Sequence, residues 1–117
     1  MRKLTGVVQR GENRGNELGF PTANIPLGDS SLAGIYVASV IVDGKEYDSA
    51  VFIDTKRKLL EAHLLDFSGE LYDKRMNVQL FVKIRENERF NDDNELKEAI
   101  ARDVQAVRDY FASRQRV

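Results

Sequence analysis

The pattern of hydrophobic and polar residues predicts β-strands and turns along most of the chain, and in part it alternates with the period of a half-buried strand. The clearest stretch is residues 76–84, where apolar side chains occupy every second position and Phe81 breaks the pattern. Residues 35–42 are apolar on both faces, as in a strand that is covered on both sides. Three further strands are expected at residues 4–9, 47–53 and 59–65.

Two local signals fix a turn and a helix. Asp43-Gly44 predicts a two-residue hairpin turn, because both residue types accept positive φ. Near the C-terminus the apolar period changes to that of a helix. This apolar stripe consists of Leu96, Ile100, Val104, Val107 and Phe111. Asp92, with Glu95 three residues later, is a capping-box-like start for the helix.

Many short strands followed by one terminal helix predict an antiparallel barrel with the helix packed across it. The 117 residues allow one domain with one hydrophobic core. We therefore expect a single domain over residues 1–117, with the barrel at about 1–90 and the helix at about 93–115. This pattern taken alone names no function.

Composition and charge exclude several classes of protein. The net charge is −1 and the basic residues do not cluster, so no nucleic-acid partner is expected. The absence of cysteine excludes disulfides, thiolate nucleophiles and zinc–thiolate sites, and it fits a reducing cytosol. The N-terminus lacks a signal-peptide pattern and no apolar run is long enough for a membrane. We expect a cytoplasmic protein without a membrane partner.

A glycine-rich segment near the N-terminus is the most informative part of the chain. Gly11, Gly15 and Gly19 are spaced by four residues, and such a loop lets backbone N–H groups approach phosphate oxygens. It is not a Walker A loop, because Gly-Lys-Ser/Thr is missing. Glycine content alone favours an ordinary surface loop with turn glycines.

Thr22 and Asn24 follow this segment and lie two residues apart. On an extended backbone their side chains share one face, where a hydroxyl and an amide oxygen suit Mg²⁺. The alternative is that both residues satisfy backbone groups of a turn, which Thr and Asn commonly do. In isolation the second interpretation is favoured.

Glu61 is a carboxylate in an otherwise apolar strand, and at a barrel mouth it could accept a proton from an attacking hydroxyl. An outward-facing glutamate in water is the more frequent case. His63, the only histidine, shares a face with Glu61 and is more often structural in such a place. Arg85 and Phe90, between the last strand and the helix, suit stacking on an aromatic ligand. A solvated turn with Phe90 plugging the core is equally compatible.

Taken together, these stretches resemble the riboflavin kinase family, specifically the kinase module of bacterial bifunctional FAD synthetases. The resemblance covers nearly the whole chain, and its most specific parts are the spaced glycines with Pro-Thr-Ala-Asn and the Glu-x-His-Leu-Leu-Asp segment. The matching stretches are residues 11–24, Gly34-Ile35-Tyr36, residues 61–67, Leu71-Tyr72, residues 84–90, Glu95-Leu96 and residues 100–103.

The resemblance implies a mostly β fold, a six-stranded antiparallel Greek-key barrel with one C-terminal α-helix. It implies an ATP-dependent kinase that phosphorylates the 5′-hydroxyl of riboflavin to give FMN and ADP. Gly11, Gly15 and Gly19 would close over the phosphates of ATP. Thr22 and Asn24 would hold Mg²⁺ and the phosphates.

By the same resemblance, Glu61 would be the base, and Arg85 and Phe90 would bound the flavin pocket. FMN rather than FAD is the expected product, because the adenylyltransferase domain of the bacterial enzymes is missing from this sequence. We expect the protein to act as a monomer.

The chain departs from the family pattern at three places. Asn16 stands where an arginine is usual, and Asp73 replaces the usual glycine after Leu-Tyr. Residues 52–58 form a connection that is shorter and more basic than in the family. This connection supports the alternative of a non-catalytic flavin- or nucleotide-binding module. An oligonucleotide-binding barrel ranks last, because no basic and aromatic stripe is present.

Overall fold

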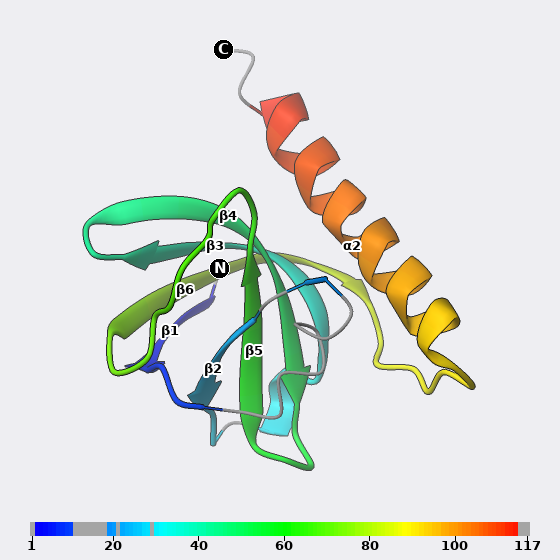
Figure 1. Cartoon of the computed structure of the whole chain (residues 1–117), viewed down its shortest axis with the longest axis horizontal. Coiled ribbons are helices and arrows are strands. Elements are labelled where there is room, and N and C mark those ends of the chain that lie inside the picture. The colour runs from blue at the N-terminus through cyan, green and yellow to red at the C-terminus, as the bar shows by residue number, and fades with distance from the viewer. Residues whose placement is uncertain (1, 11–18, 21, 29, 115–117) are drawn as a thin grey trace.

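A computed structural model describes residues 2–10, 19–20, 22–28 and 30–114, and Figure 1 shows its arrangement. Six strands and a long C-terminal helix account for most of these described residues. The elements are β1 (Arg2–Val7), β2 (Ala23–Pro26), the short 3₁₀ helix η1 (Ser30–Leu32), β3 (Gly34–Val42), β4 (Lys45–Asp54), β5 (Leu59–Leu64), β6 (Arg75–Arg85) and α2 (Asp93–Arg114).

The strands form one antiparallel sheet in the order β1-β6-β3-β4-β5-β2. β3, β4 and β5 follow each other as neighbours, and β6 returns to lie beside β3. This is the Greek-key arrangement, so the predicted fold class is confirmed. The hairpin turn between β3 and β4 is also confirmed, with positive φ at Asp43 (53°) and Gly44 (75°).

The two outer strands of the sheet, β1 and β2, approach each other and nearly close it into a barrel (Figure 1). An isolated antiparallel bridge joins Gln9 to Asn24 at this seam. Gly6 of β1 faces Ile25 of β2 so closely that a Cβ atom on Gly6 would lie 3.0 Å from the Ile25 Cβ. The seam therefore depends on a residue without a side chain.

Apolar residues on alternate positions of every strand fill the barrel. A second, smaller cluster lies outside the barrel wall, where Val107 of α2 packs on Val37 of β3 and Ala50 of β4. This explains why β3 is apolar on both faces: α2 covers the outer one. Ile41, farther along β3, lies outside this cluster and is 42% exposed.

Strand β6 differs from the sequence expectation beyond its middle. Val82, expected to be buried, is 45% exposed, whereas Phe81 packs against Tyr110 and Phe111 of α2. The register between β6 and β3 shifts at two places in this part of the strand pair. Such irregularities turn side chains to the other face, which a strict period of two cannot anticipate. The short strand β2 was not predicted by the alternation either.

Helix α2 begins as its sequence predicts. The Asp92 carboxylate accepts a hydrogen bond from the Glu95 N–H (2.8 Å), and the Glu95 carboxylate accepts one from the Asn91 N–H (3.0 Å). Ile100 and Val107 of the apolar stripe are buried, and the other members are half-buried. No helix among the described residues is both long enough and apolar enough to cross a membrane.

Candidate active site

Five directly paired residues form one row across the outer wall of the barrel: Asn24, Glu61, Phe52, Ile35 and Arg85. The neighbours of Glu61 along β5, at positions 60 and 62, belong to the barrel core, so the Glu61 side chain faces outward. The row therefore lies on the outer wall rather than at the barrel mouth suggested from the sequence. Sheet register thus places three predicted site residues in one row, with Asn24 and Glu61 as neighbours and Arg85 at the far end.

A cavity of about 190 Å³ lies over this row. The barrel wall supplies Glu61, Phe52 and Ile35, and the segment before β2 supplies Thr22. The opposite side comes from the linker after β6 and the first turns of α2. These residues are Asn87, Glu88, Phe90, Leu96 and Ile100. We call this space the linker cavity; it brings together the predicted residues Thr22, Glu61, Arg85 and Phe90.

A second cavity, of about 260 Å³, lies on the other side of Thr22, which lines both spaces. Its walls come from the start of β2, from β5 and from the segment between β5 and β6. They include Ala23, Ala62, Phe67 and Tyr72. We call it the seam cavity, because Val8, the residue after β1, and Ala23 of β2 both line it. Two compartments therefore share Thr22 as a common wall.

Two buried oxygens lack a hydrogen-bond partner within the described part of the chain: Thr22 Oγ1, in this common wall, and Asn24 Oδ1, two residues farther along the chain. A buried polar atom without a partner costs about 1–3 kcal/mol, so proteins rarely keep one without a use. Hard oxygen donors of this kind suit Mg²⁺. The described residues contain no cluster of three His, Asp or Glu side chains for a metal. A cation here would depend on the two neutral oxygens and on the phosphates of a ligand.

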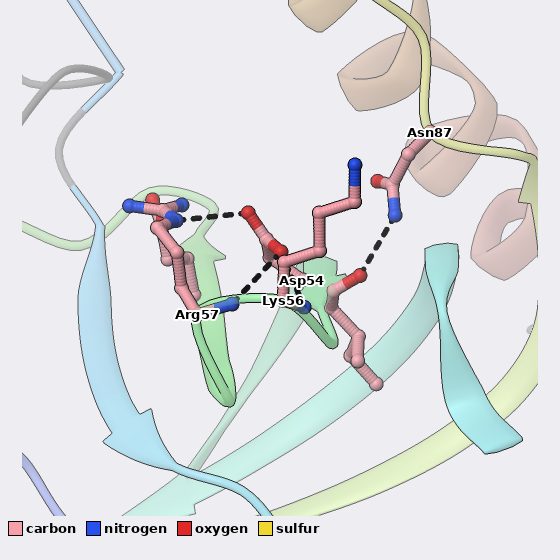
Figure 2. Close-up of polar contacts among 6 residues, drawn as sticks. Asp54, Lys56, Arg57 and Asn87 are labelled. Atoms are coloured by element: carbon pink, nitrogen blue, oxygen red, sulfur yellow. Dashed lines mark hydrogen bonds and ion pairs between the residues drawn. The ribbon is translucent and has the colours of Figure 1, made fainter. Parts of the chain in front are cut away.

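Glu61 is held by a cation from the turn between β4 and β5 (Figure 2 shows that turn). Arg57 Nη2 donates to Glu61 Oε1 (2.5 Å), and Arg57 Nε donates to Asp54 Oδ2 (2.8 Å). The hydrogen bond from Arg57 is the main reason that the pKa of Asp54 is lowered. The same bond raises the pKa of Arg57 above its usual value. The guanidinium is therefore a permanent cation between two carboxylates.

Arg85 has a structural partner in addition to its place in the linker cavity. Its Nε and Nη2 donate to the two carboxylate oxygens of Asp103 (2.9 and 2.8 Å), and Asp103 is only 2% exposed. The guanidinium carbon also lies 5.7 Å from the centre of the Phe90 ring. Asn87 donates to the Ile53 carbonyl (2.9 Å; Figure 2). These contacts fasten the linker to the barrel and to α2.

The predicted site residues fall into three groups. Gly11 and Gly15 lie outside the described residues. Gly19 has a φ of +91°, the left-handed region that favours glycine, and lines neither cavity. The remaining predicted residues meet at the linker cavity or pair beside it. The histidine expected to be structural, His63, packs edge-on against Phe20, with ring centres 5.6 Å apart.

Sequence reasoning missed Asp54, Arg57, Asn87 and Asp103. The basic run at residues 56–58 was noticed only as a departure from the family pattern. The signal for Asp103 was available, because it lies three residues after Ile100 on the buried stripe of α2. A carboxylate at such a position requires a buried partner, and Arg85 provides it.

Fold and site together define a small barrel protein that can bring two ligands to a common wall. A family model described as riboflavin kinase matches residues 2–111. The chain belongs to the riboflavin kinase family, as the resemblance predicted.

Relatives of known name agree with this assignment. The chain is 41% identical to a trifunctional protein RibF/MnmA of Mycoplasmoides gallisepticum, covering 92% of this chain and 18% of that protein. It is 38% identical to a bifunctional riboflavin kinase/FMN adenylyltransferase of Pseudomonas fluorescens, covering 91% of this chain and 37% of that protein. The Escherichia coli K12 protein of the same name is also 38% identical. The chain thus spans well under half the length of these relatives.

A solved structure supports the barrel architecture. It is described as a macrolide-efflux protein from Streptococcus pneumoniae and superposes with a TM-score of 0.80 at 25% sequence identity. The match covers 91% of this chain and 38% of that one. Macrolide efflux is the description of that protein alone.

Proposed function

We propose that this chain is an ATP-dependent riboflavin kinase that transfers the γ-phosphate of ATP to the 5′-hydroxyl of riboflavin, giving FMN and ADP. The observation that carries the proposal is the position of Thr22. It lines both cavities, and its buried hydroxyl has no hydrogen-bond partner among the described residues. Two substrates in adjoining cavities would meet beside it, with Glu61 in the wall of one of them.

Riboflavin occupies the linker cavity in this proposal, because its apolar walls suit a flat aromatic ring. Phe52, Phe90 and Leu96 supply these walls. The nucleotide occupies the seam cavity in this proposal, with its phosphates beside Thr22, which lines that cavity, and the nearby Asn24. The predicted phosphate contacts of Gly11, Gly15 and Gly19 remain part of the proposal, although the first two lie outside the described residues.

The transfer requires little covalent chemistry from the protein. The 5′-oxygen of riboflavin forms a bond to the γ-phosphorus, the bond from that phosphorus to the β–γ bridging oxygen breaks, and ADP leaves with the bonding electrons. The hydroxyl proton passes to the Glu61 carboxylate as the new bond forms. Holding the hydroxyl at Glu61 and the phosphates at Thr22 supplies much of the rate enhancement, because positioning removes an entropic cost.

Mg²⁺ is part of the proposal, with Thr22 Oγ1 and Asn24 Oδ1 as its protein ligands. Their buried and unpartnered oxygens match its preference for hard oxygen donors. When bound, it would supply neutralisation of the phosphate charge. We further propose a monomer in the cytoplasm, where ATP is abundant.

The decisive experiment incubates the protein with riboflavin, ATP and Mg²⁺ and measures FMN by chromatography. Glu61→Gln is compared with Glu46→Gln, which changes an exposed glutamate of β4 that lines neither substrate cavity. We expect FMN from the wild type and from Glu46→Gln, and a loss of at least about 100-fold in Glu61→Gln. Binding of riboflavin without any FMN would overturn the kinase and leave a flavin-binding module.

A further inference from the structure

Arg57 belongs to the turn between β4 and β5, and its side chain lines the linker cavity. The guanidinium contacts Glu61 at 2.5 Å and Asp54 at 2.8 Å, and the side chain is 40% exposed. It therefore lies beside the carboxylate that faces the attacking hydroxyl in the proposed reaction. A cation at this point contacts Glu61, the group whose charge changes when it accepts the proton.

The turn that carries Arg57 does not depend on its side chain. Asp54 Oδ1 accepts hydrogen bonds from the backbone N–H groups of Lys56 (2.9 Å) and Arg57 (3.2 Å), as Figure 2 shows. The other carboxylate oxygen of Asp54 accepts from the guanidinium. Asp54 thus sets the turn through the backbone and anchors the cation with its second oxygen. A substitution of Arg57 leaves both backbone bonds in place.

The proposed reaction moves negative charge past Arg57. Before transfer, Glu61 is a carboxylate and the riboflavin hydroxyl is neutral. After transfer, the proton from the hydroxyl neutralises Glu61, and the flavin carries a phosphate of about −2 charge on the oxygen that Glu61 contacted. The anion on the Glu61 side of Arg57 thus changes from the Glu61 carboxylate to the new phosphate, while Asp54 remains on the other side. A guanidinium fork can bind either group.

The other arginine of the linker cavity is already committed to a buried carboxylate. Arg85 donates two hydrogen bonds to Asp103, whose side chain is 3% exposed. Moving Arg85 to a phosphate would leave that charge buried and unpaired, at a cost of several kcal/mol. The two carboxylates that Arg57 is seen to contact are not buried in this way, because Asp54 and Glu61 reach solvent at 39% and 20% side-chain exposure.

Resting on the proposed function, we infer that Arg57 positions Glu61 before phosphoryl transfer and binds the 5′-phosphate of FMN afterwards. Arg57 accordingly discriminates FMN from riboflavin, whose ring and ribityl chain are otherwise the same. This role belongs to the basic turn at residues 54–58, a part of the chain that the family motifs do not cover.

The test measures the dissociation constants of FMN and riboflavin separately, by quenching of flavin fluorescence without nucleotide. Arg57→Gln and Arg57→Lys are compared with Arg108→Gln. Arg108 is a matched control, because it is an exposed arginine that donates to Asp66 and lines neither substrate cavity. Thermal unfolding followed by circular dichroism establishes that each variant is folded.

We expect Arg57→Gln to weaken FMN binding by at least about tenfold and riboflavin binding by less than about threefold. Arg57→Lys keeps the charge and should fall between the wild type and Arg57→Gln, and Arg108→Gln should match the wild type. If the wild type makes FMN but Arg57→Gln weakens the binding of FMN and riboflavin equally, or weakens neither, the role of Arg57 alone is overturned. A wild type that makes no FMN would overturn the proposed function and this inference together.

Discussion

The hydroxyl of Thr22 and the amide oxygen of Asn24 lower the stability of the ligand-free protein, because both atoms are buried without a partner among the described residues. We propose that ligand binding at the common wall offsets this cost. Residues that serve a reaction in this way often lower stability, since the unbound site is less well satisfied than a purely structural one.

Thr22→Val therefore separates function from stability. The change keeps the shape of the side chain and removes the unpartnered hydroxyl, so stability to urea should rise by about 1 kcal/mol. The kcat/KM for ATP should fall at least about tenfold. Ser39→Ala is the control, because Ser39 Oγ is also buried without a partner among the described residues, and Ser39 lines a different cavity. It should gain stability and keep full activity; equal losses of activity in both variants would contradict the assignment.

The Asp54–Arg57 pair gives a pH-dependent prediction. Because Arg57 lowers the pKa of Asp54, the carboxylate stabilises the fold above about pH 4, and this contribution is lost as pH falls through the lowered pKa. In a carbon-13 NMR titration, Asp54 should titrate below its ordinary value, and Arg57→Gln should raise its midpoint.

Asp48 provides the internal reference for that titration. Burial, followed by the charges of Glu46 and Asp66, raises the pKa of Asp48, and Arg57 takes no part in this shift. Its midpoint should lie above the ordinary value and stay there in Arg57→Gln. An Asp54 midpoint that does not respond to Arg57→Gln would show that the pair does not persist in solution.

At the scale of elements, the position of α2 depends on a charge pair as well as on apolar packing. Arg85 at the end of β6 and Asp103 in the middle of α2 are 18 residues apart and joined by two hydrogen bonds. This pair closes the linker between them into a fixed wall of the linker cavity. Helix packing and cavity shape are therefore coupled.

Asp103→Ala should lower the free energy of unfolding by about 3 kcal/mol, because it leaves Arg85 without its buried partner. It should also weaken riboflavin binding, since the linker loses its anchor. The double variant Arg85→Met with Asp103→Leu should recover more than half of the lost stability, because neither partner is left charged. Urea denaturation of the three proteins tests this, and a double variant less stable than Asp103→Ala would refute it.

At the scale of the whole molecule, the barrel seam connects stability with the common wall. The same short segment that meets β1 also carries Thr22 and Asn24, and Asn24 bridges to Gln9. Anything that separates β1 from β2 should therefore disturb the two unpartnered oxygens together.

Gly6→Val should destabilise the protein by about 2 kcal/mol, because even a Cβ atom at this position would lie only 3.0 Å from the Ile25 Cβ. FMN formation should fall further than the small unfolded fraction explains. Gly28→Val is the matched control, since no neighbouring atom lies within 4 Å of a Cβ at that position. Melting temperatures and rates of FMN formation are compared for the two variants. Equal values in Gly6→Val and Gly28→Val would mean that the seam between β1 and β2 accommodates the larger side chain.

Much of this molecule was determined by its sequence alone. The hairpin at Asp43-Gly44, the cap at Asp92 and the apolar stripe of α2 are local patterns, and local patterns require no knowledge of distant neighbours. The family was likewise evident, because its motifs are short and contiguous. The irregular end of β6 was not, since its bulges arise from pairing with β3.

Only the tertiary structure decided which residues meet. The row from Asn24 through Glu61 to Arg85 exists because strand register aligns positions far apart in the chain. The buried pair of Arg85 with Asp103 joins residues 18 positions apart through the packing of α2, whereas the contact of Arg57 with Glu61 spans four residues and depends on the turn between β4 and β5. The physical reason is that sequence period fixes the face on which a side chain lies, whereas register and packing fix its partner.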